Sequence, residues 1–235
     1  MFTLDKSINI HHFKELIVNK QIFVFDGVIG AGKTTLLKLL TKHMNKMGKK
    51  TLAIYEPVDV WRNVGALDEF YKDIPGKCLE FQTFTFITRV KRIMNEILEN
   101  PDYDYYILER SIWTDRYIFV ELLKDVMGPI RMEMYNQWWD MWVSLMPMLP
   151  NKWVFLNTSL QESIRRICIR DRFEEKNSIS IEYQNNLYNK HIEFYKRLRD
   201  SGHNTIEITS EIMDKNFMED ESVIDAIYNQ IIDDN

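Results

Sequence analysis

Cysteine is scarce in this sequence, and its histidines are scattered. Only two cysteines occur among 235 residues, Cys78 and Cys168, and neither has a partner at the spacing of a metal or redox site. We expect no disulfide framework, but two buried or half-buried thiols in a reducing, intracellular protein, with the cytoplasm as its compartment. The five histidines do not fall at ligand spacing either, so we expect no protein-held zinc.

A large charge of one sign and long apolar runs are also lacking. Lys and Arg number 30 against 35 Asp and Glu, a formal net charge of −5, which argues against attraction to polymeric nucleic acid or to an anionic membrane. The chain has no run of about 18 apolar residues, and no apolar segment followed by a cleavage site near its start. We expect neither membrane insertion nor export, and any bound anion must be held by a local site.

The residues that are present predict one substantial α/β domain over residues 1–235. Hydrophobic residues make up 45% of the chain, and no repeat, low-complexity tract or linker divides it. Five short segments rich in β-branched and aromatic residues read as strands: Ile22–Phe25, Thr51–Tyr55, Tyr105–Leu108, Trp153–Asn157 and Thr205–Ile208. Most of them are nearly continuous apolar runs, which is typical of a parallel sheet covered by helices on both faces.

Amphipathic segments alternate with these strands. The pattern predicts helices over Lys33–Met47, Cys78–Glu99, Ser111–Met127, Arg131–Met146, Leu160–Arg172, Ile181–Asp200 and about Asp220–Ile232. The helix over Arg131–Met146 carries Trp138, Trp139 and Trp142. We expect this aromatic cluster in the core, with an exposed part as a possible dimer surface.

A phosphate-binding loop follows the first strand and opens the first of these helices. Its residues fit G-x-x-x-x-G-K-[ST] and are followed by Thr35: Gly27, Val28, Ile29, Gly30, Ala31, Gly32, Lys33 and Thr34. Glycines let successive backbone N–H groups face a phosphate, and the helix N-terminus adds its partial positive charge. Lys33 would reach the β and γ phosphates of ATP, and the Thr34 hydroxyl would bind Mg²⁺.

Charged residues follow the second and third strands. Glu56 comes directly after the second strand, and Glu109 and Arg110 come at the end of the third. Because ligands bind at the carboxyl ends of parallel strands, we expect these groups to meet in one crevice. A carboxylate there can accept a hydroxyl proton, and a guanidinium can stabilise a migrating phosphoryl group.

Four blocks, EPVxxW, FQTFTFITR, ERSIWTDRYIF and RRICIRDRFEE, resemble the deoxynucleoside kinase family in order and spacing. The similarity runs from about Ile22 to about Arg197. The resemblance implies a P-loop kinase fold, with a five-stranded parallel sheet, flanking helices and an Arg-rich lid. It also implies transfer from ATP to the 5′-hydroxyl of a deoxynucleoside, and a homodimer formed through two long helices.

The resemblance also implies roles for individual residues. Glu56 would be the base, Arg110 its partner at the phosphoryl group, and Glu109 would help to organise Mg²⁺. The nucleoside would contact Trp61, Phe81 and Phe119 around its ring, Gln82 at its base edge, and Tyr71 with Glu175 at its 3′-hydroxyl. The lid would place Arg170 and Arg172 over the phosphates and Arg166 near the adenine, with Phe217 as a further adenine contact.

Arg89 and Asp115 bear on the choice of base. Members that accept deoxycytidine or deoxyguanosine resemble this sequence in carrying the pair, which favours those nucleosides over thymidine, although Thr85 stands where those members usually have a smaller residue. Gly30 replaces the family's usual alanine, which should be harmless in such a loop.

Two alternatives stay open. A thymidylate-type monophosphate kinase shares the loop and the Glu-Pro pair, but here Tyr55 stands before that pair instead of an arginine. A nucleotide-dependent switch or scaffold has little support, because the chain lacks an Asn-Lys-x-Asp motif.

Overall fold

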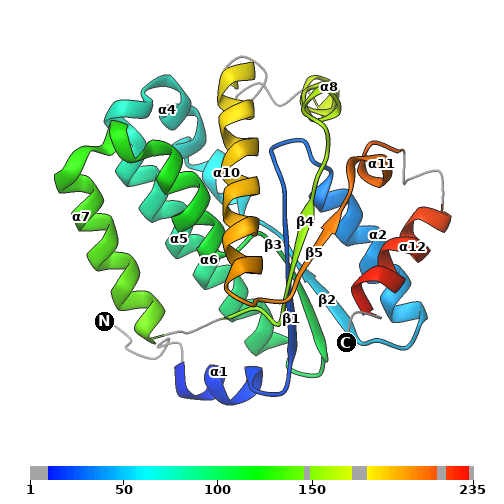
Figure 1. Cartoon of the computed structure of the whole chain (residues 1–235). Helices are drawn as coiled ribbons and strands as arrows, with labels where there is room; N and C mark the ends of the chain where they lie inside the picture. Colours follow the sequence, from blue (N-terminus) through cyan, green and yellow to red (C-terminus); the bar gives the residue numbers. More distant parts are fainter. Residues whose placement is uncertain (1–9, 146–148, 171–178, 216–220, 233–235) are drawn as a thin grey trace.

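The computed structural model describes residues 10–145, 149–170, 179–215 and 221–232. Within them the chain forms a five-stranded sheet in the order β2-β3-β1-β4-β5, with every neighbouring pair parallel (Figure 1). The strands are β1 Gln21–Asp26, β2 Thr51–Ile54, β3 Tyr105–Glu109, β4 Lys152–Leu156 and β5 Thr205–Ile208. The predicted sheet is confirmed, with strand ends shifted by one residue in several places.

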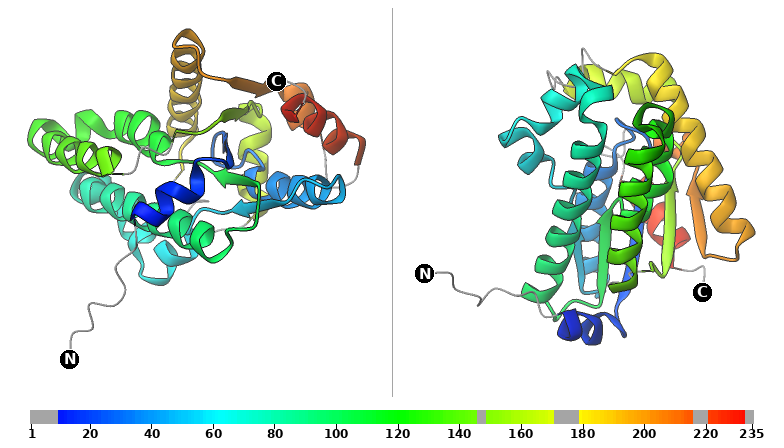
Figure 2. Two further views of the ribbon diagram at one scale, coloured as in Figure 1. Left: turned by 90° about the horizontal axis from the view of Figure 1, so that it is seen from below. Right: turned by 90° about the vertical axis from the view of Figure 1, so that its left-hand side faces the viewer.

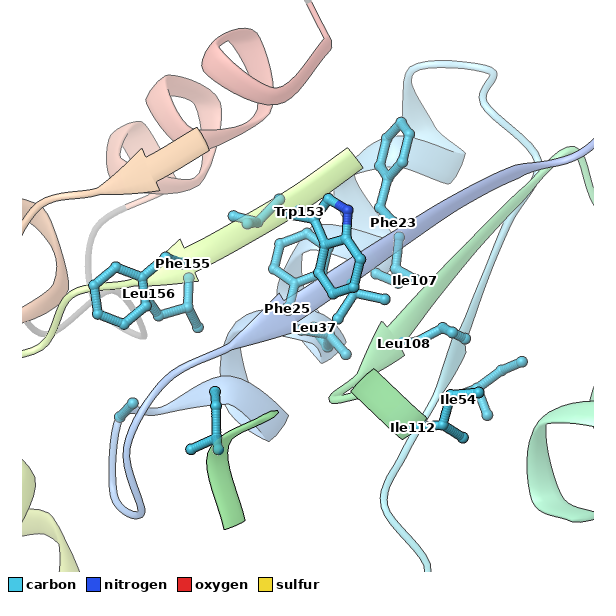
Figure 3. Close-up of a cluster of buried hydrophobic side chains, with 14 of the residues drawn as sticks. Phe23, Phe25, Leu37, Ile54, Ile107, Leu108, Ile112, Trp153, Phe155 and Leu156 are labelled. Carbon is cyan, nitrogen blue, oxygen red and sulfur yellow. The ribbon is translucent and has the colours of Figure 1, made fainter. Parts of the chain in front are cut away.

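The central strands carry the core of the molecule. All five residues of β4 are buried, as are all residues of β1 after Gln21. In Figure 3, Trp153 of β4 lies close to Phe25 of β1, and Phe155 lies beside Leu156 farther along β4. Ile107 of β3 pairs with Phe23 on the other edge of β1. Continuous burial explains why these strands read as apolar runs without alternation, because helices exclude water from both faces.

Helices cover both faces of the sheet. On one side lie α2 (Lys33–Lys46) and α12 (Glu221–Ile232), and on the other α5 (Ile74–Glu99), α7 (Glu121–Leu145) and α10 (Ile181–Asp200) (Figure 1). Figure 2 shows α5 and α7 side by side along most of their length. The remaining helices are α1 Ile10–Ile17, α3 Val58–Asn63, α4 Ala66–Lys72, α6 Ile112–Thr114, α8 Leu160–Arg170 and α11 Ser210–Met213.

The segment after β3 differs from the prediction of one continuous helix over Ser111–Met127. It consists of α6, a π-helical segment η1 (Asp115–Val120) and the start of α7. The π-helical turn adds one residue to the helical repeat, which an apolar pattern of period 3.6 does not reveal. Gly128 breaks the helical geometry with φ 70° and ψ 173°, and Pro129 follows it, so α7 consists of two helical segments that meet at a kink. The predicted break near Gly128 is confirmed.

Two further expectations are corrected. α5 begins at Ile74, four residues before the predicted Cys78, because the Asp73 side chain accepts the Gly76 N–H at 3.0 Å and caps the helix. Cys78 is buried as expected, but Cys168 is exposed on α8. Among the described helices, none combines the length and apolar character needed to cross a membrane.

Candidate active site

The phosphate loop joins β1 to α2. Gly30 and Gly32 have φ values of +82° and +91°, in the left-handed region that favours glycine. The buried Lys33 ammonium donates to the carbonyl oxygens of Gly27 and Val28 at 3.1 and 3.0 Å. The lysine is therefore held over the loop at the N-terminus of α2, where backbone N–H groups and the helix dipole favour an anion.

Helix α8 packs directly against this loop. A β-carbon added at Gly30 would overlap the carbonyl oxygen of Ser163 in α8, so only glycine fits this close approach. Gln184 of α10 makes a second connection, because its Nε2 donates to the carbonyl oxygen of Ile29 and to Ser163 Oγ. The close packing of α8 against the loop thus requires a glycine at position 30, where the resembled family usually has alanine.

Two cavities meet at the loop. The larger, about 570 Å³, lies between the loop, α8 and the residues that follow α11. The smaller, about 270 Å³, lies between the loop, α3, α4 and α5. Both are lined by Gly30, Lys33, Thr34, Glu109 and Arg170. A phosphate chain held in the larger cavity would therefore end beside whatever occupies the smaller one.

Aromatic side chains form the walls of the smaller cavity. Its lining includes Trp61, Phe70, Tyr71, Phe81, Gln82 and Phe119. Phe70 and Phe81 stack with ring centroids 4.4 Å apart, and Trp61 meets Phe81 edge-on at 6.0 Å. Trp61 is anchored by its Nε1, which donates to Thr88 Oγ1 at 2.8 Å. Apolar walls with one amide suit a planar heterocycle that has a polar edge.

A buried carboxylate–guanidinium network stands against this cavity. Glu56 Oε1 accepts from Arg89 Nη2 at 2.9 Å and lies 3.3 Å from Arg110 Nε. Arg89 also donates to both oxygens of Asp115, at 2.9 and 3.0 Å. Burial alone would raise the pKa of Glu56, but the charges of Arg110, Arg89 and Lys33 outweigh it and hold that pKa at about 2. Glu56 is therefore ionised in the ligand-free protein.

Arg110 has an unusual backbone conformation. Its φ of +65° makes it the one residue other than glycine with a positive φ among the described residues. Its guanidinium lies 4.8 Å from the centroid of the Phe119 ring and 3.8 Å from Asp26 Oδ1. Burial raises the pKa of Asp26 to about 6, although Arg110 and a hydrogen bond from Thr114 act to lower it.

Thr34 and Glu109 stand together where the cavities join. The Thr34 hydroxyl donates to Glu109 Oε1 at 2.8 Å. Burial and the nearby charge of Glu56 raise the pKa of Glu109. No group of three or more His, Cys, Asp or Glu able to hold a metal occurs among the described residues. A hydroxyl and a carboxylate beside a phosphate loop fit Mg²⁺, which takes few protein ligands and fills its shell with phosphate oxygens and water.

Comparison with known proteins agrees with this geometry. The sequence profile of the deoxynucleoside kinase family matches residues 23–234. The chain belongs to the deoxynucleoside kinase family. As a member it is a nucleoside kinase, and the family implies ATP as the phosphoryl donor.

Individual relatives of this deoxynucleoside kinase are named for different nucleosides. The probable deoxycytidine kinase of fowlpox virus is 32% identical over 178 residues, which cover 75% of this chain and 72% of the relative. Deoxycytidine kinase 2 of Gallus gallus is 27% identical, with 81% and 80% covered. Human mitochondrial thymidine kinase 2 is 30% identical, with 74% and 64% covered. The kinase class is thus shared while the nucleoside differs.

The lid residues are only partly within the described structure. Arg170 is exposed on the last turn of α8 and lines both cavities. Arg166 lines the larger cavity and ties α8 to the loop, donating from Nη1 to the Ala31 carbonyl oxygen at 3.1 Å and from Nη2 to that of Met213 at 2.6 Å. The predicted positions Arg172, Glu175 and Phe217 lie outside the described residues.

Most of the other predicted site residues come together. Glu56, Trp61, Tyr71, Phe81, Gln82, Arg110 and Phe119 all line the smaller cavity, and Thr35 lines the larger one. Arg89 and Asp115 are 3% and 2% exposed and lie behind Glu56 instead of in the cavity lining. The pair can therefore act on a nucleoside through Glu56 and the cavity wall.

The sequence-based prediction missed several lining residues. Phe70 lies on the short helix α4, and Tyr183 lies near the start of α10, more than 100 residues away along the chain. Asp214 and Lys215 line the larger cavity just after α11. Phe70 had a signal in its neighbour Tyr71, whereas Tyr183 had none in the local pattern.

Proposed function

We propose that this kinase transfers the γ-phosphoryl group of ATP to the 5′-hydroxyl of a deoxynucleoside and releases the 5′-monophosphate. Deoxycytidine and purine deoxynucleosides are favoured over thymidine as substrates. The observation that carries the proposal is the placement of Glu56 and Arg110 in the lining of an aromatic cavity that also contains Lys33 of the phosphate loop. A hydroxyl acceptor, a base and the end of a triphosphate thus have adjoining places.

The smaller cavity supplies the nucleoside contacts. The base lies between the rings of Trp61, Phe81 and Phe119, and the Gln82 amide hydrogen-bonds its polar edge. Gln82 is 3% exposed and lines the cavity, so a base edge with matching donors and acceptors supplies its amide with hydrogen-bond partners. Tyr71, with Glu175, holds the 3′-hydroxyl, and this contact turns the 5′-hydroxyl toward Glu56.

Glu56 acts first by orienting the hydroxyl and then by taking its proton. A carboxylate with a pKa of about 2 is a weak base toward an alcohol in the ground state. Phosphoryl transfer passes through a loose transition state, in which the attacking hydroxyl becomes acidic as its bond to phosphorus forms. The proton therefore moves late, to a carboxylate that its arginines have kept ionised and correctly placed.

Positive charge stabilises the moving phosphoryl group. Lys33, Arg110 and Arg170 line the smaller cavity and supply this charge, with Arg172 added by the family resemblance. Helix α8 closes over the group to exclude water that would hydrolyse ATP. Thr34 and Glu109 would hold Mg²⁺, which supplies charge neutralisation between phosphate oxygens when bound. No covalent intermediate with the protein is required.

The choice of nucleoside rests on the buried Arg89–Asp115 pair. Both side chains are buried and joined by two hydrogen bonds, and Arg89 also donates to Glu56 in the cavity wall. The proposal is tested by measuring turnover with deoxycytidine, deoxyguanosine, deoxyadenosine and thymidine. The monophosphate of each nucleoside is assayed separately as an acceptor. We expect turnover of nucleosides with thymidine the poorest. Turnover of monophosphates alone would instead establish a monophosphate kinase.

We also propose that the kinase acts as a homodimer through α7 and its neighbour α5. Large apolar side chains are exposed along α7: Val126, Ile130, Met134, Met141 and Leu145. An exposed apolar row on a long helix favours a protein partner. Sedimentation equilibrium should give twice the chain mass, and Met134→Glu should shift it toward the monomer, whereas a wild-type monomer would refute the dimer.

A further inference from the structure

His191 of α10 is a buried residue that the mechanism above does not use. It is 0% exposed, and its ring stacks on Phe155 of β4 with centroids 6.0 Å apart. Its Nε2 lies 3.3 Å from Arg110 Nη1, and its Nδ1 lies 2.8 Å from the carbonyl oxygen of Leu187. The imidazole therefore connects α10 to the guanidinium that is placed at the phosphoryl group.

The two contacts fix the tautomer of the ring. A carbonyl oxygen only accepts hydrogen bonds, so Nδ1 must carry the proton that it donates to Leu187. An arginine N–H only donates, so Nε2 must be the unprotonated acceptor. Burial and the charge of Arg110 lower the pKa of His191 well below its usual value, which agrees with a neutral ring.

A neutral acceptor suits this place better than an acid would. Arg110 already faces two carboxylates, with Nε 3.3 Å from Glu56 Oε1 and Nη1 3.8 Å from Asp26 Oδ1. A third carboxylate would quench the positive charge that the phosphoryl group needs. An imidazole nitrogen instead takes one N–H in a fixed direction and leaves the net charge of the guanidinium unchanged.

We propose that His191 is a positioning residue. Its Nε2 accepts a hydrogen bond from Arg110 Nη1 and so holds the guanidinium toward the phosphoryl group. Without it, Arg110 can swing toward the buried Asp26 carboxylate and withdraw from the cavity. The inference rests on the proposed role of Arg110 in phosphoryl transfer. Displacement of a catalytic group by about 1 Å typically costs about 100-fold in rate, so we expect a loss of about 10- to 100-fold.

Two substitutions at position 191 separate positioning from packing. His191→Phe keeps a flat ring on Phe155 but has no acceptor, and it should lower kcat about 10- to 100-fold while the KM values for nucleoside and MgATP stay near wild type. His191→Gln supplies an amide oxygen near the place of Nε2 and should recover most of the rate. His203→Phe, at a histidine that meets Trp153 edge-on outside this network, is the matched control and should have wild-type kinetics.

The double variant with Arg110→Ala tests whether His191 acts through Arg110. We expect His191→Phe to have no further effect on kcat in the Arg110→Ala background, because the guanidinium through which His191 acts is absent there. An equal loss in both backgrounds, or wild-type kcat in His191→Phe, would overturn the proposal. A rise in KM without a fall in kcat would do the same.

The tautomer gives a readout that does not depend on turnover. Long-range ¹H–¹⁵N NMR of the ligand-free protein should show His191 protonated at Nδ1 and unprotonated at Nε2 from pH 5 to 8. An Nε2–H tautomer or a charged ring would contradict the proposed bond even if neither variant folds. If the tautomer is as expected but no deoxynucleoside is phosphorylated, the proposed function fails while the contact to Arg110 stands.

Discussion

The two cavities of this kinase are built in different ways. The larger one relies on backbone: a glycine-rich loop at a helix N-terminus, with a lysine and the arginines of α8 around it. The smaller one relies on side chains that are buried in pairs, with Glu56, Arg89, Arg110 and Asp115 each neutralised by another member. A backbone site depends on conformation and space, whereas an ion-pair network depends on every partner being present.

The largest effect is expected at Glu56. Glu56→Gln keeps the size of the side chain but removes the charge that faces Arg89 and Arg110, so turnover should fall about 10²- to 10⁴-fold. MgATP binding should stay close to wild type, because Glu56 does not line the larger cavity. Steady-state kinetics and calorimetric ATP binding measure the two quantities.

Glu69→Gln, at an exposed acid of α4 that pairs with Lys77, provides the matched control and should be silent. Unchanged turnover in Glu56→Gln would remove this carboxylate from the mechanism, and a parallel loss of ATP binding would mean that the two cavities are not independent.

The next largest effect is expected from breaking the buried Arg89–Asp115 pair. Asp115→Asn leaves Arg89 with Glu56 as its remaining carboxylate, and the free energy of unfolding should fall by about 3 kcal/mol. Urea denaturation measures this loss. Arg92, whose pair with Asp59 is exposed, offers the contrast: Asp59→Asn should cost no more than about 1 kcal/mol. Equal effects at the two sites would show that burial does not set the strength of the network.

For the phosphate loop, the sharpest test adds a single methyl group at Gly30. Gly30→Ala places a β-carbon against the Ser163 carbonyl oxygen at a residue with φ +82°, so α8 must move away from the loop. Unfolding should become easier by about 2 kcal/mol, and MgATP should bind more weakly.

Gly48→Ala is the control for backbone strain alone, because Gly48 has φ +78° with open space around it. It should cost about 1 kcal/mol and leave MgATP binding intact. The same result at both glycines would mean that the packing of α8 against the loop has no part in binding.

The last expected effect is a pH dependence of stability from Asp26, which develops gradually over about two pH units. Its pKa is raised from 3.8 to about 6 in the fold, so the proton is bound more tightly in the folded than in the unfolded chain. The stability that this carboxyl contributes is complete below about pH 3.8 and is lost as the pH rises to about 6, with a slope of at most about 1.4 kcal/mol per pH unit.

Asp26→Asn should remove this component, which urea denaturation between pH 4 and 6.5 can detect. Glu56 acts with the opposite sign at lower pH, because its pKa is lowered from 4.5 to about 2 and its contribution is lost as the pH falls through that window. Asp102→Asn, at an exposed acid, should keep the wild-type profile. A wild-type profile in Asp26→Asn would contradict the raised pKa.

The two cavities also differ in how far the sequence predicts them. Lys33 and Thr34 belong to one contiguous motif between a strand and a helix, so local pattern suffices. Glu56 and Arg110 follow from their places at the ends of neighbouring strands. Gln82 and Tyr71 had no signal of their own and were identified only through resemblance to a family.

The features that the sequence did not predict arise from contacts between distant segments. His191 contacts Arg110, which lies 81 positions earlier in the chain. Nothing in the sequence around this lone histidine indicates a distant arginine as its partner. The π-helical turn of η1 packs against α5 and α10, and such contacts between distant segments leave no mark in the local apolar pattern. Short helices such as α3 and α4 form because tertiary contacts outweigh their weak intrinsic tendency.

A structure with a deoxynucleoside and ADP bound is the most direct test of the account. We expect the sugar's 5′-oxygen within about 3 Å of a Glu56 carboxylate oxygen and directed toward the β-phosphate, with Arg110 between them. A 5′-oxygen that lies far from Glu56, or that points away from the β-phosphate, would contradict the proposed transfer.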